Sequence, residues 1–223
     1  ENELSDDEIQ LSMDVDVEDE KKHDSNYKYV MLGCYTLALT STMFSSLGFA
    51  PVANTLNVIY DADPIIITLC NTIFLIASIL MSVPLMKIIQ VKGLRFNIVV
   101  AALIAGVLCW LRMVVIFIQE LWIVLIFSVP LAIAQAIYLM LISKLANEWF
   151  PEHQRRLATA AATLAFALGP LLANIIPIMF ISEEDAIDTE KGKTDFEHYL
   201  FVQCIIISVC NLPFAYLARD KNQ

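Results

Sequence analysis

The chain has 223 residues, of which 58% are hydrophobic and only 17% charged, and its formal net charge is −10. Soluble domains are usually about half apolar and about a quarter charged, so this composition excludes an ordinary soluble domain and indicates a membrane protein. The acidic residues are concentrated in residues 1–26 and 181–198. Acidic segments of this kind exclude binding to nucleic acid, so no nucleic-acid partner is expected.

The N-terminal segment is too polar and acidic to bury a core. Residues 1–27 are predicted to form a disordered, acidic cytosolic tail. The chain begins with Glu1, and no cationic segment followed by a cleavage site is visible. We therefore expect a processed chain or a fragment, without a signal peptide.

Six stretches are long and apolar enough to cross a bilayer, which takes about 20 mostly apolar residues per helix. They are apolar nearly all round, as is typical of helices in lipid. The predicted spans are 29–52, 65–88, 96–118, 121–145, 157–181 and 199–217. Residues 28–218 are therefore predicted to form an all-α integral membrane bundle of six transmembrane helices.

Basic residues predict the orientation of this bundle. Eight lie in or beside the connections that follow the second, fourth and sixth spans, and two lie between the fifth and sixth spans. Connections rich in Lys and Arg stay on the cytosolic side, so both termini are predicted to be cytosolic. The eight are Lys87, Lys92, Arg95, Lys144, Arg155, Arg156, Arg219 and Lys221, and the two are Lys191 and Lys193.

The connection KLANEWFPEHQRR, residues 144–156, interrupts the apolar spans with a dense polar segment. Trp149 and Phe150 suit the headgroup region of a bilayer, and Pro151 separates two helices. His153 and two nearby glutamates match no metal-binding pattern such as HExxH, so a solvated surface is favoured. The five cysteines lie in apolar runs without paired spacing and are interpreted as reduced and buried. We predict no metal and no cofactor.

Several motifs resemble those of a known transporter family. The stretch PLMKIIQVKGLR, residues 84–95, resembles the connection between helices two and three of major facilitator transporters, although Met86 and Gln90 depart from the general pattern. The elements GLR (93–95), GFAPVANT (48–55), LRMV (111–114) and KLANEWFPEHQR (144–155) are similar to solute carrier family 49, and most of all to its orphan major facilitator member. The feline leukaemia virus subgroup C receptors are better-known relatives. The resemblance covers about residues 28–217.

This resemblance implies a twelve-helix fold in two halves. The chain would be the N-terminal half, built from two inverted three-helix repeats, and residues 219–223 would begin the central cytosolic linker. Its partners would be the lipid bilayer, a small organic solute and the C-terminal six-helix half of the same protein. A six-helix protein that works as a homodimer is the alternative.

The resemblance also implies that the cytosolic connections gate the transporter. The candidate gating residues are Gly93, Arg95, Glu148 and Arg155. The alternative is that the cations only anchor the topology, since Gln90 replaces the acidic residue that normally pairs there.

Polar residues inside the spans are candidates for contact with a solute, because an unsatisfied polar group in lipid is costly. The resemblance implies that the first and fourth helices line the cavity, and the position of a substrate-contacting glutamine in the subgroup C receptors is Ala167 here. Hydrogen bonds within or between helices are the alternative role for these polar groups. The candidate cavity residues are Thr42, Ser45, Ser46, Gln135, Tyr138 and Phe166.

Two further features stand out within the spans. Arg112 is the only formal charge well inside a span, and such charges often mark function. We expect its side chain to extend towards Glu120 at the outer surface, in a structural role. The small residues Ala165 and Gly169 predict a close approach between helices, and Pro170 predicts a bend.

The expected function is secondary transport of a small organic solute by alternating access, without enzymatic activity. The resemblance implies an amine similar to choline or ethanolamine, or haem, and a plasma-membrane location. No carboxylate lies at the middle of a span, which favours uniport over proton coupling. A non-transporting membrane receptor or scaffold is the alternative.

Overall fold

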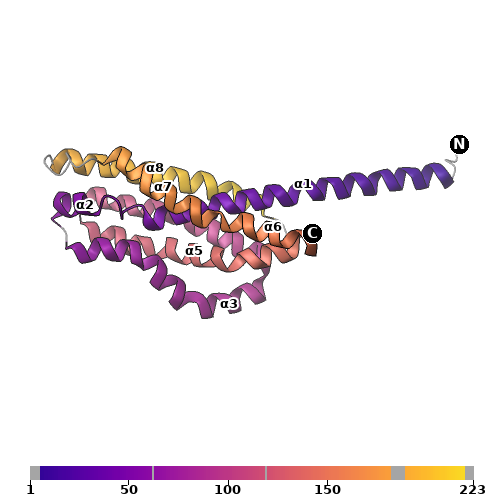
Figure 1. Cartoon of the computed structure of the whole chain (residues 1–223), viewed down its shortest axis with the longest axis horizontal. Coiled ribbons are helices and arrows are strands. Elements are labelled where there is room, and N and C mark those ends of the chain that lie inside the picture. The colour runs from indigo at the N-terminus through magenta and orange to yellow at the C-terminus, as the bar shows by residue number, and fades with distance from the viewer. Residues whose placement is uncertain (1–5, 62, 119, 182–188, 219–223) are drawn as a thin grey trace.

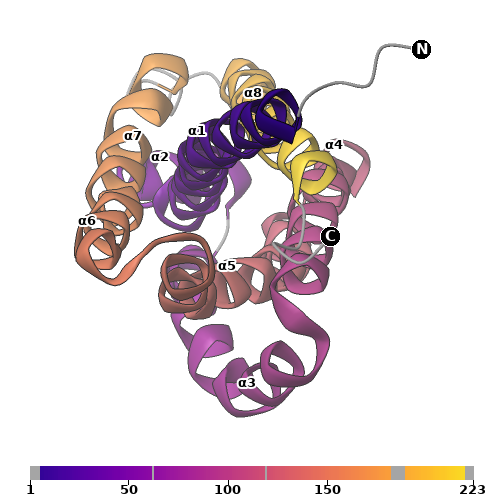
Figure 2. The same ribbon diagram turned by 90° about the vertical axis from the view of Figure 1, so that its right-hand side faces the viewer.

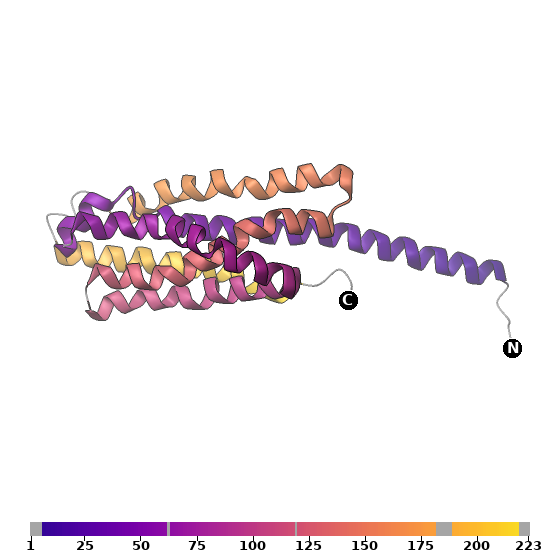
Figure 3. The ribbon, with the colours of Figure 1, turned by 90° about the horizontal axis from the view of Figure 1, so that it is seen from below.

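The computed structural model describes residues 6–61, 63–118, 120–181 and 189–218, and these form helices joined by short connections. Most helices run along one common axis, and successive long segments run along the bundle in alternating directions (Figures 1 and 3). In chain order the elements are α1 (Asp6–Leu47), α2 (Ala53–Tyr60), α3 (Pro64–Leu108), the 3₁₀ helix η1 (Cys109–Val114), α4 (Val115–Ile118), α5 (Leu121–Trp149), α6 (Glu152–Thr163), α7 (Ala165–Phe180) and α8 (Thr189–Leu217).

α3 and the segments that follow it run along the bundle in both directions. The apolar stretch Thr68–Ile118 has 51 residues, which as one straight helix would measure about 76 Å, more than twice the ~30 Å of a bilayer core. Gly93 has φ 79° and ψ 176°, a conformation open essentially only to glycine. The chain reverses at this point, so α3 runs to one end of the bundle and returns (Figure 1).

The predicted membrane bundle is confirmed. Within the described residues, five helices are long and apolar enough to cross a membrane: Tyr27–Leu47, Thr68–Ile118, Leu121–Trp149, Glu152–Phe180 and Thr189–Leu217. The second of these covers residues 68–88 of the predicted span 65–88 and all of the predicted span 96–118. The first helix ends at Leu47 instead of residue 52, and α8 begins ten residues before the predicted sixth span.

The predicted acidic tail overlaps α1, which is helical from Asp6. Residues 6–26 contain no glycine and no proline, the two residues that most strongly oppose a helix. The apolar part of α1 begins only at Tyr27. The acidic segment therefore extends the helix beyond the bundle (Figure 1).

The two ends of the bundle carry different connections. The bend within α3, the junction between α5 and α6 and the end of α8 lie at one end, from which the acidic part of α1 projects (Figures 1 and 3). At the opposite end, α2 stops at Asp61, whose φ is 45°, and Asp63 caps α3 by accepting a hydrogen bond from the Ile65 amide at 2.9 Å. This arrangement groups the basic connections at one end.

Two clusters of buried side chains form the core. The larger one joins α1, α3, α5 and α8 and includes Met31, Tyr35 and Phe214. The smaller one lies towards the α2 end and includes Phe44, Phe49 and Phe196. α6 and α7 lie at one edge of the bundle (Figure 2), and most of the large apolar side chains of α7 are exposed. Such a surface suits contact with lipid or with another apolar helix layer.

Candidate functional site

Arg112 lies at the junction of four helical segments and is fully buried. Its Nη1 donates hydrogen bonds to Ser45 Oγ at 2.6 Å and to Gln203 Oε1 at 2.9 Å. Its Nη2 donates to Ser128 Oγ at 2.7 Å. One guanidinium in η1 therefore joins α1, α5 and α8.

The expectation that Arg112 extends towards the outer surface is wrong. The reason lies in the helix face that Arg112 shares with buried residues. Ile98, Ala101, Ala105 and Cys109 precede it at intervals of three or four residues, and all four are fully buried. This spacing places Arg112 on the inward face of the helical segment.

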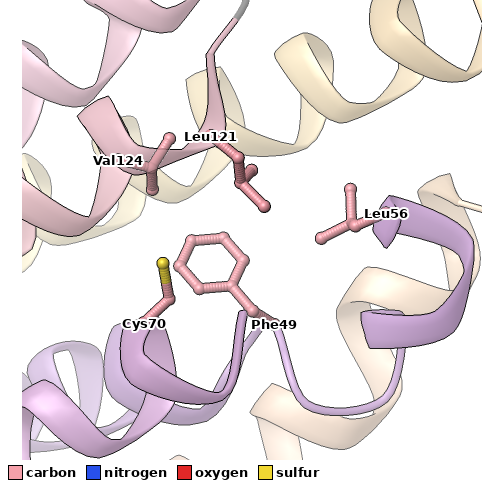
Figure 4. A pocket seen from close by; sticks show the side chains of 5 residues that line it. All are labelled: Phe49, Leu56, Cys70, Leu121 and Val124. Carbon is pink, nitrogen blue, oxygen red and sulfur yellow. The ribbon is translucent and has the colours of Figure 1, made fainter. Parts of the chain in front are cut away.

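Aromatic and apolar groups surround the guanidinium. Its Cζ lies 5.6 Å from the ring centroid of Phe49 and 5.8 Å from that of Phe74, within the range of cation–π attraction. Phe49 also borders a narrow crevice with Leu56, Cys70, Leu121 and Val124, whose side chains converge in Figure 4. The crevice has about 170 Å³ of empty space but no room for a water molecule. The three hydrogen bonds that the Arg112 guanidinium donates all go to protein side chains.

Within the described residues, no carboxylate lies within ion-pair distance of Arg112. Its bonding partners are two hydroxyls and one amide, and its Nε has no hydrogen-bond partner among the described groups. A buried charge without a counter-ion is costly, so these three bonds and the two rings must offset its desolvation. Further bonds support the site: Gln203 Nε2 donates to Tyr199 Oη at 2.9 Å, and Tyr199 Oη donates to the Gly48 carbonyl at 3.3 Å.

A second polar network crosses the middle of the bundle. Tyr138 donates from its hydroxyl to Asn211 Oδ1 at 2.7 Å, and Asn211 Nδ2 donates to Ser41 Oγ at 3.0 Å. The Tyr35 hydroxyl donates to the backbone carbonyl of Tyr138. These four side chains are buried, and together they join α1, α5 and α8.

The six candidate cavity residues occupy different environments. The hydroxyls of Thr42 and Ser46 donate to carbonyls of their own helix, at 2.9 Å and 2.8 Å respectively. Ser45 belongs to the Arg112 site and Tyr138 to the central network, so both bond to protein groups. Phe166 is 46% exposed on the outer face of α7. The structure does not gather the six around one cavity.

Gln135 differs from the other candidates. It lies at the midpoint of α5 and is 6% exposed. Its Nε2 donates to the sulfur of Met43 at 3.2 Å, a weak acceptor, and its Oε1 has no hydrogen-bond partner among the described groups. This amide retains hydrogen-bonding capacity in the middle of the bundle.

The candidate gating residues lie at the end of the bundle that carries the basic connections. Gly93 forms the reversal in α3, and Arg95 follows it on the surface. Glu148 forms an ion pair with Lys144 at 3.9 Å. Arg155 donates from Nε to the Phe150 carbonyl at 3.2 Å and pairs with Glu152 at 3.8 Å.

Lys144 makes the bond that connects these two regions. Its Nζ donates to the Ile89 carbonyl at 2.7 Å and so joins α5 to the first half of α3. From the sequence, Lys144 was interpreted only as an anchor of the topology. The sequence offered one signal that Lys144 could also join two helices. Lys144 and Glu148 are one helical turn apart, so Glu148 can hold the ammonium at the helix surface by an ion pair.

The sequence matches the Major Facilitator Superfamily over residues 33–222. The chain belongs to the Major Facilitator Superfamily. This superfamily consists of membrane transporters and not of enzymes.

Individual relatives of this superfamily member come from solute carrier family 49, as the motifs indicated. The chain is 28% identical to solute carrier family 49 member A3 of Danio rerio, over 70% of this chain and 34% of the relative. It is 27% identical to the same protein of Xenopus tropicalis, over 72% of this chain and 35% of the relative. It is 22% identical to the choline/ethanolamine transporter FLVCR1 of Mus musculus, over 69% of this chain and 28% of the relative. The chain thus matches about a third of the length of these curated relatives.

Proposed function

We propose that the protein is a secondary transporter that moves a small organic amine, similar to choline or ethanolamine, across a membrane by alternating access. The superfamily match over residues 33–222 supports the transport class. The amine is supported by one relative named as a choline/ethanolamine transporter. The C-terminal half of such a transporter would complete the pathway.

Gln135 is the observation that carries the substrate class. An amide oxygen that is buried without a partner costs about 1–3 kcal/mol, and a solute with an O–H or N–H group would remove that cost on binding. Choline offers a hydroxyl, and ethanolamine offers a hydroxyl and an ammonium. Because the Oε1 of Gln135 lies at the middle of α5, this interaction would form midway across the bilayer.

Gating in this proposal depends on the contact between α5 and α3. The Lys144 ammonium donates a hydrogen bond to the Ile89 carbonyl, and Glu148 forms an ion pair with the same ammonium. Movement of α5 relative to the first half of α3 would break these bonds and open that end of the bundle. The transporter would lie in the plasma membrane. Both termini and this end of the bundle would face the cytosol.

Uptake by vesicles tests the proposed function. The complete protein is reconstituted into liposomes, and the entry of radiolabelled choline, ethanolamine and haem is compared with empty liposomes. We expect choline or ethanolamine to enter faster than in the control, and Gln135→Ala to reduce the rate at least tenfold.

Gln90→Ala is the matched control, because Gln90 carries the same amide on the exposed surface near the bend of α3. We expect this variant to transport like the unmodified protein. Uptake of haem alone would overturn the amine assignment, and no uptake of any of the three solutes would favour a receptor or scaffold.

A further inference from the structure

Two aromatic rings and an amide surround the Lys28 ammonium at the basic end of the bundle. Here the Lys28 ammonium lies 5.1 Å from the ring centroid of Tyr29 and 5.8 Å from that of Phe150. It also donates a hydrogen bond to Gln154 Oε1 at 3.2 Å. Two π faces and a neutral acceptor are the groups that bind organic ammonium ions in proteins.

The two rings form a preorganised pair. Tyr29 and Phe150 meet edge to face, with centroids 5.9 Å apart. Phe150 is almost fully buried, whereas Tyr29 is 52% exposed. One ring is therefore fixed by the core, and the other faces the surroundings from which a ligand would arrive.

A cavity adjoins the rings and is larger than the lysine ammonium requires. Tyr29, Phe150 and Gln154 border about 180 Å³ of space open to a water-sized molecule, well above the ~10–15 Å³ that one water needs by the same measure. The remaining walls are apolar: Leu32, Leu157, Ala158 and Ala161. Such walls suit methyl or methylene groups attached to an ammonium.

Arg155, a second cation near the rings, does not occupy this space. Arg155 is bonded to the Phe150 carbonyl through Nε and paired with Glu152. Lys28 has a flexible four-carbon stem and is half-buried at the surface. Its ammonium can therefore leave the rings for water while the rings stay in place.

We propose that Tyr29, Phe150 and Gln154 form a peripheral binding site for a small organic ammonium ion, and that Lys28 is its tethered competitor. The identity of the physiological ligand rests on the proposed function, because the transported amine would meet this site at the basic end of the pathway. Lys28 would leave when the solute binds and return when it departs. Solute release would then not leave the aromatic site empty.

Equilibrium binding of radiolabelled tetramethylammonium to the complete protein in lipid nanodiscs tests this site without requiring transport. Lys28→Met removes the competitor, and we expect it to tighten binding at least threefold. In the Lys28→Met background, Tyr29→Leu removes one ring and is expected to weaken binding about two- to fivefold. Tyr29→Phe keeps the ring and should restore it.

Lys92→Met is the matched control, because the Lys92 ammonium lies 5.6 Å from the centroid of one ring, that of Phe96, near the bend of α3. It should leave tetramethylammonium binding unchanged. Unaltered binding in Lys28→Met, or equal binding with leucine and phenylalanine at position 29, would overturn the peripheral site even if choline uptake is found. Altered binding in these variants without any uptake would instead retain the site and reject the transport function.

Discussion

At the scale of single residues, Arg112 shows how a buried charge is accommodated without a carboxylate. Ser45, Ser128 and Gln203 accept its hydrogen bonds at 2.6–2.9 Å. Two of the three acceptors also make a bond that does not depend on the arginine: Ser128 donates to the Val124 carbonyl, and Gln203 donates to Tyr199 through Nε2. Removing the guanidinium therefore leaves Ser128 and Gln203 with one hydrogen bond each and removes the cost of a buried charge.

This asymmetry predicts an unusual order of stability at position 112. Arg112→Lys keeps a buried charge but cannot reach three acceptors in three helices, so we expect it to lower the free energy of unfolding by about 3 kcal/mol. Arg112→Met removes the charge and keeps an apolar chain, so its loss should be about half as large. Thermal unfolding in detergent, followed by tryptophan fluorescence, measures the order. A lysine variant as stable as the methionine variant would contradict this account of the site.

At the scale of helices, glycine sets the distance between α1 and α7. A Cβ atom added to Gly169 would lie 2.3 Å from the Cβ of Met43 and 3.2 Å from the Thr40 carbonyl. The sequence predicted a close approach here from the small residues around Gly169. The structure identifies α1 as the partner, and the same Met43 side chain accepts the hydrogen bond from Gln135.

Gly169→Ala should therefore push α7 away from α1. We expect a loss of about 1–3 kcal/mol in the free energy of unfolding, because backbone and Cβ atoms cannot move aside as a flexible side chain can. Gly33→Ala is the control on α1, since nothing lies within 4 Å of its added Cβ. It should stabilise the helix by up to about 1 kcal/mol. Similar denaturation curves for the two variants would show that α1 and α7 do not pack this closely.

At the scale of the whole molecule, the sidedness of the connections determines the orientation in the membrane. Asp61 lies at the end of α2, and Lys92 lies next to the reversal at Gly93. One passage through the bundle separates them, so they lie at opposite ends. Lys and Arg gather at the end that contains Lys92, which is therefore expected to be cytosolic.

Labelling of single cysteines with a membrane-impermeant maleimide tests this orientation. In a background without the five native cysteines, Asp61→Cys should be labelled on intact cells, and Lys92→Cys only after the membrane is permeabilised. His153→Cys, at the exposed start of α6, should behave like Lys92→Cys. The reverse pattern would place the basic connections outside. Labelling of Asp61→Cys and Lys92→Cys from one side would contradict a membrane passage between them.

Features that depend on apolar composition were predictable from the sequence, whereas features that depend on individual contacts between distant residues were not. The apolar spans were predictable because about 20 apolar residues have few stable environments other than a bilayer. The reversal between 88 and 96 was predictable for the same reason, and Gly93 supplies the conformation for it. The hydrogen-bond partners of Arg112 were not predictable, because Ser45, Gln203 and Ser128 lie in three other helices that only folding brings to it.

The candidate cavity residues show the same limit of prediction from the sequence. Thr42, Ser46 and Tyr138 were reasonable candidates by residue type, but hydrogen-bond partners decide which polar groups remain available. The Tyr138 hydroxyl donates its hydrogen bond to Asn211, which lies 73 positions away in the chain. Gln135 could be nominated from the sequence, while its unpartnered oxygen is evident only when its neighbours are in place.

By itself, the sequence determined that the chain lies in a membrane, where it crosses and which connections carry positive charge, because these properties depend on composition along short segments. Only the tertiary structure decided that Arg112 is bonded inside the bundle, that the Gln135 oxygen has no hydrogen-bond partner among the described residues and that Lys28 lies beside two rings. The physical reason is that hydrogen bonds and π contacts act over a few ångströms, between residues that only folding brings together.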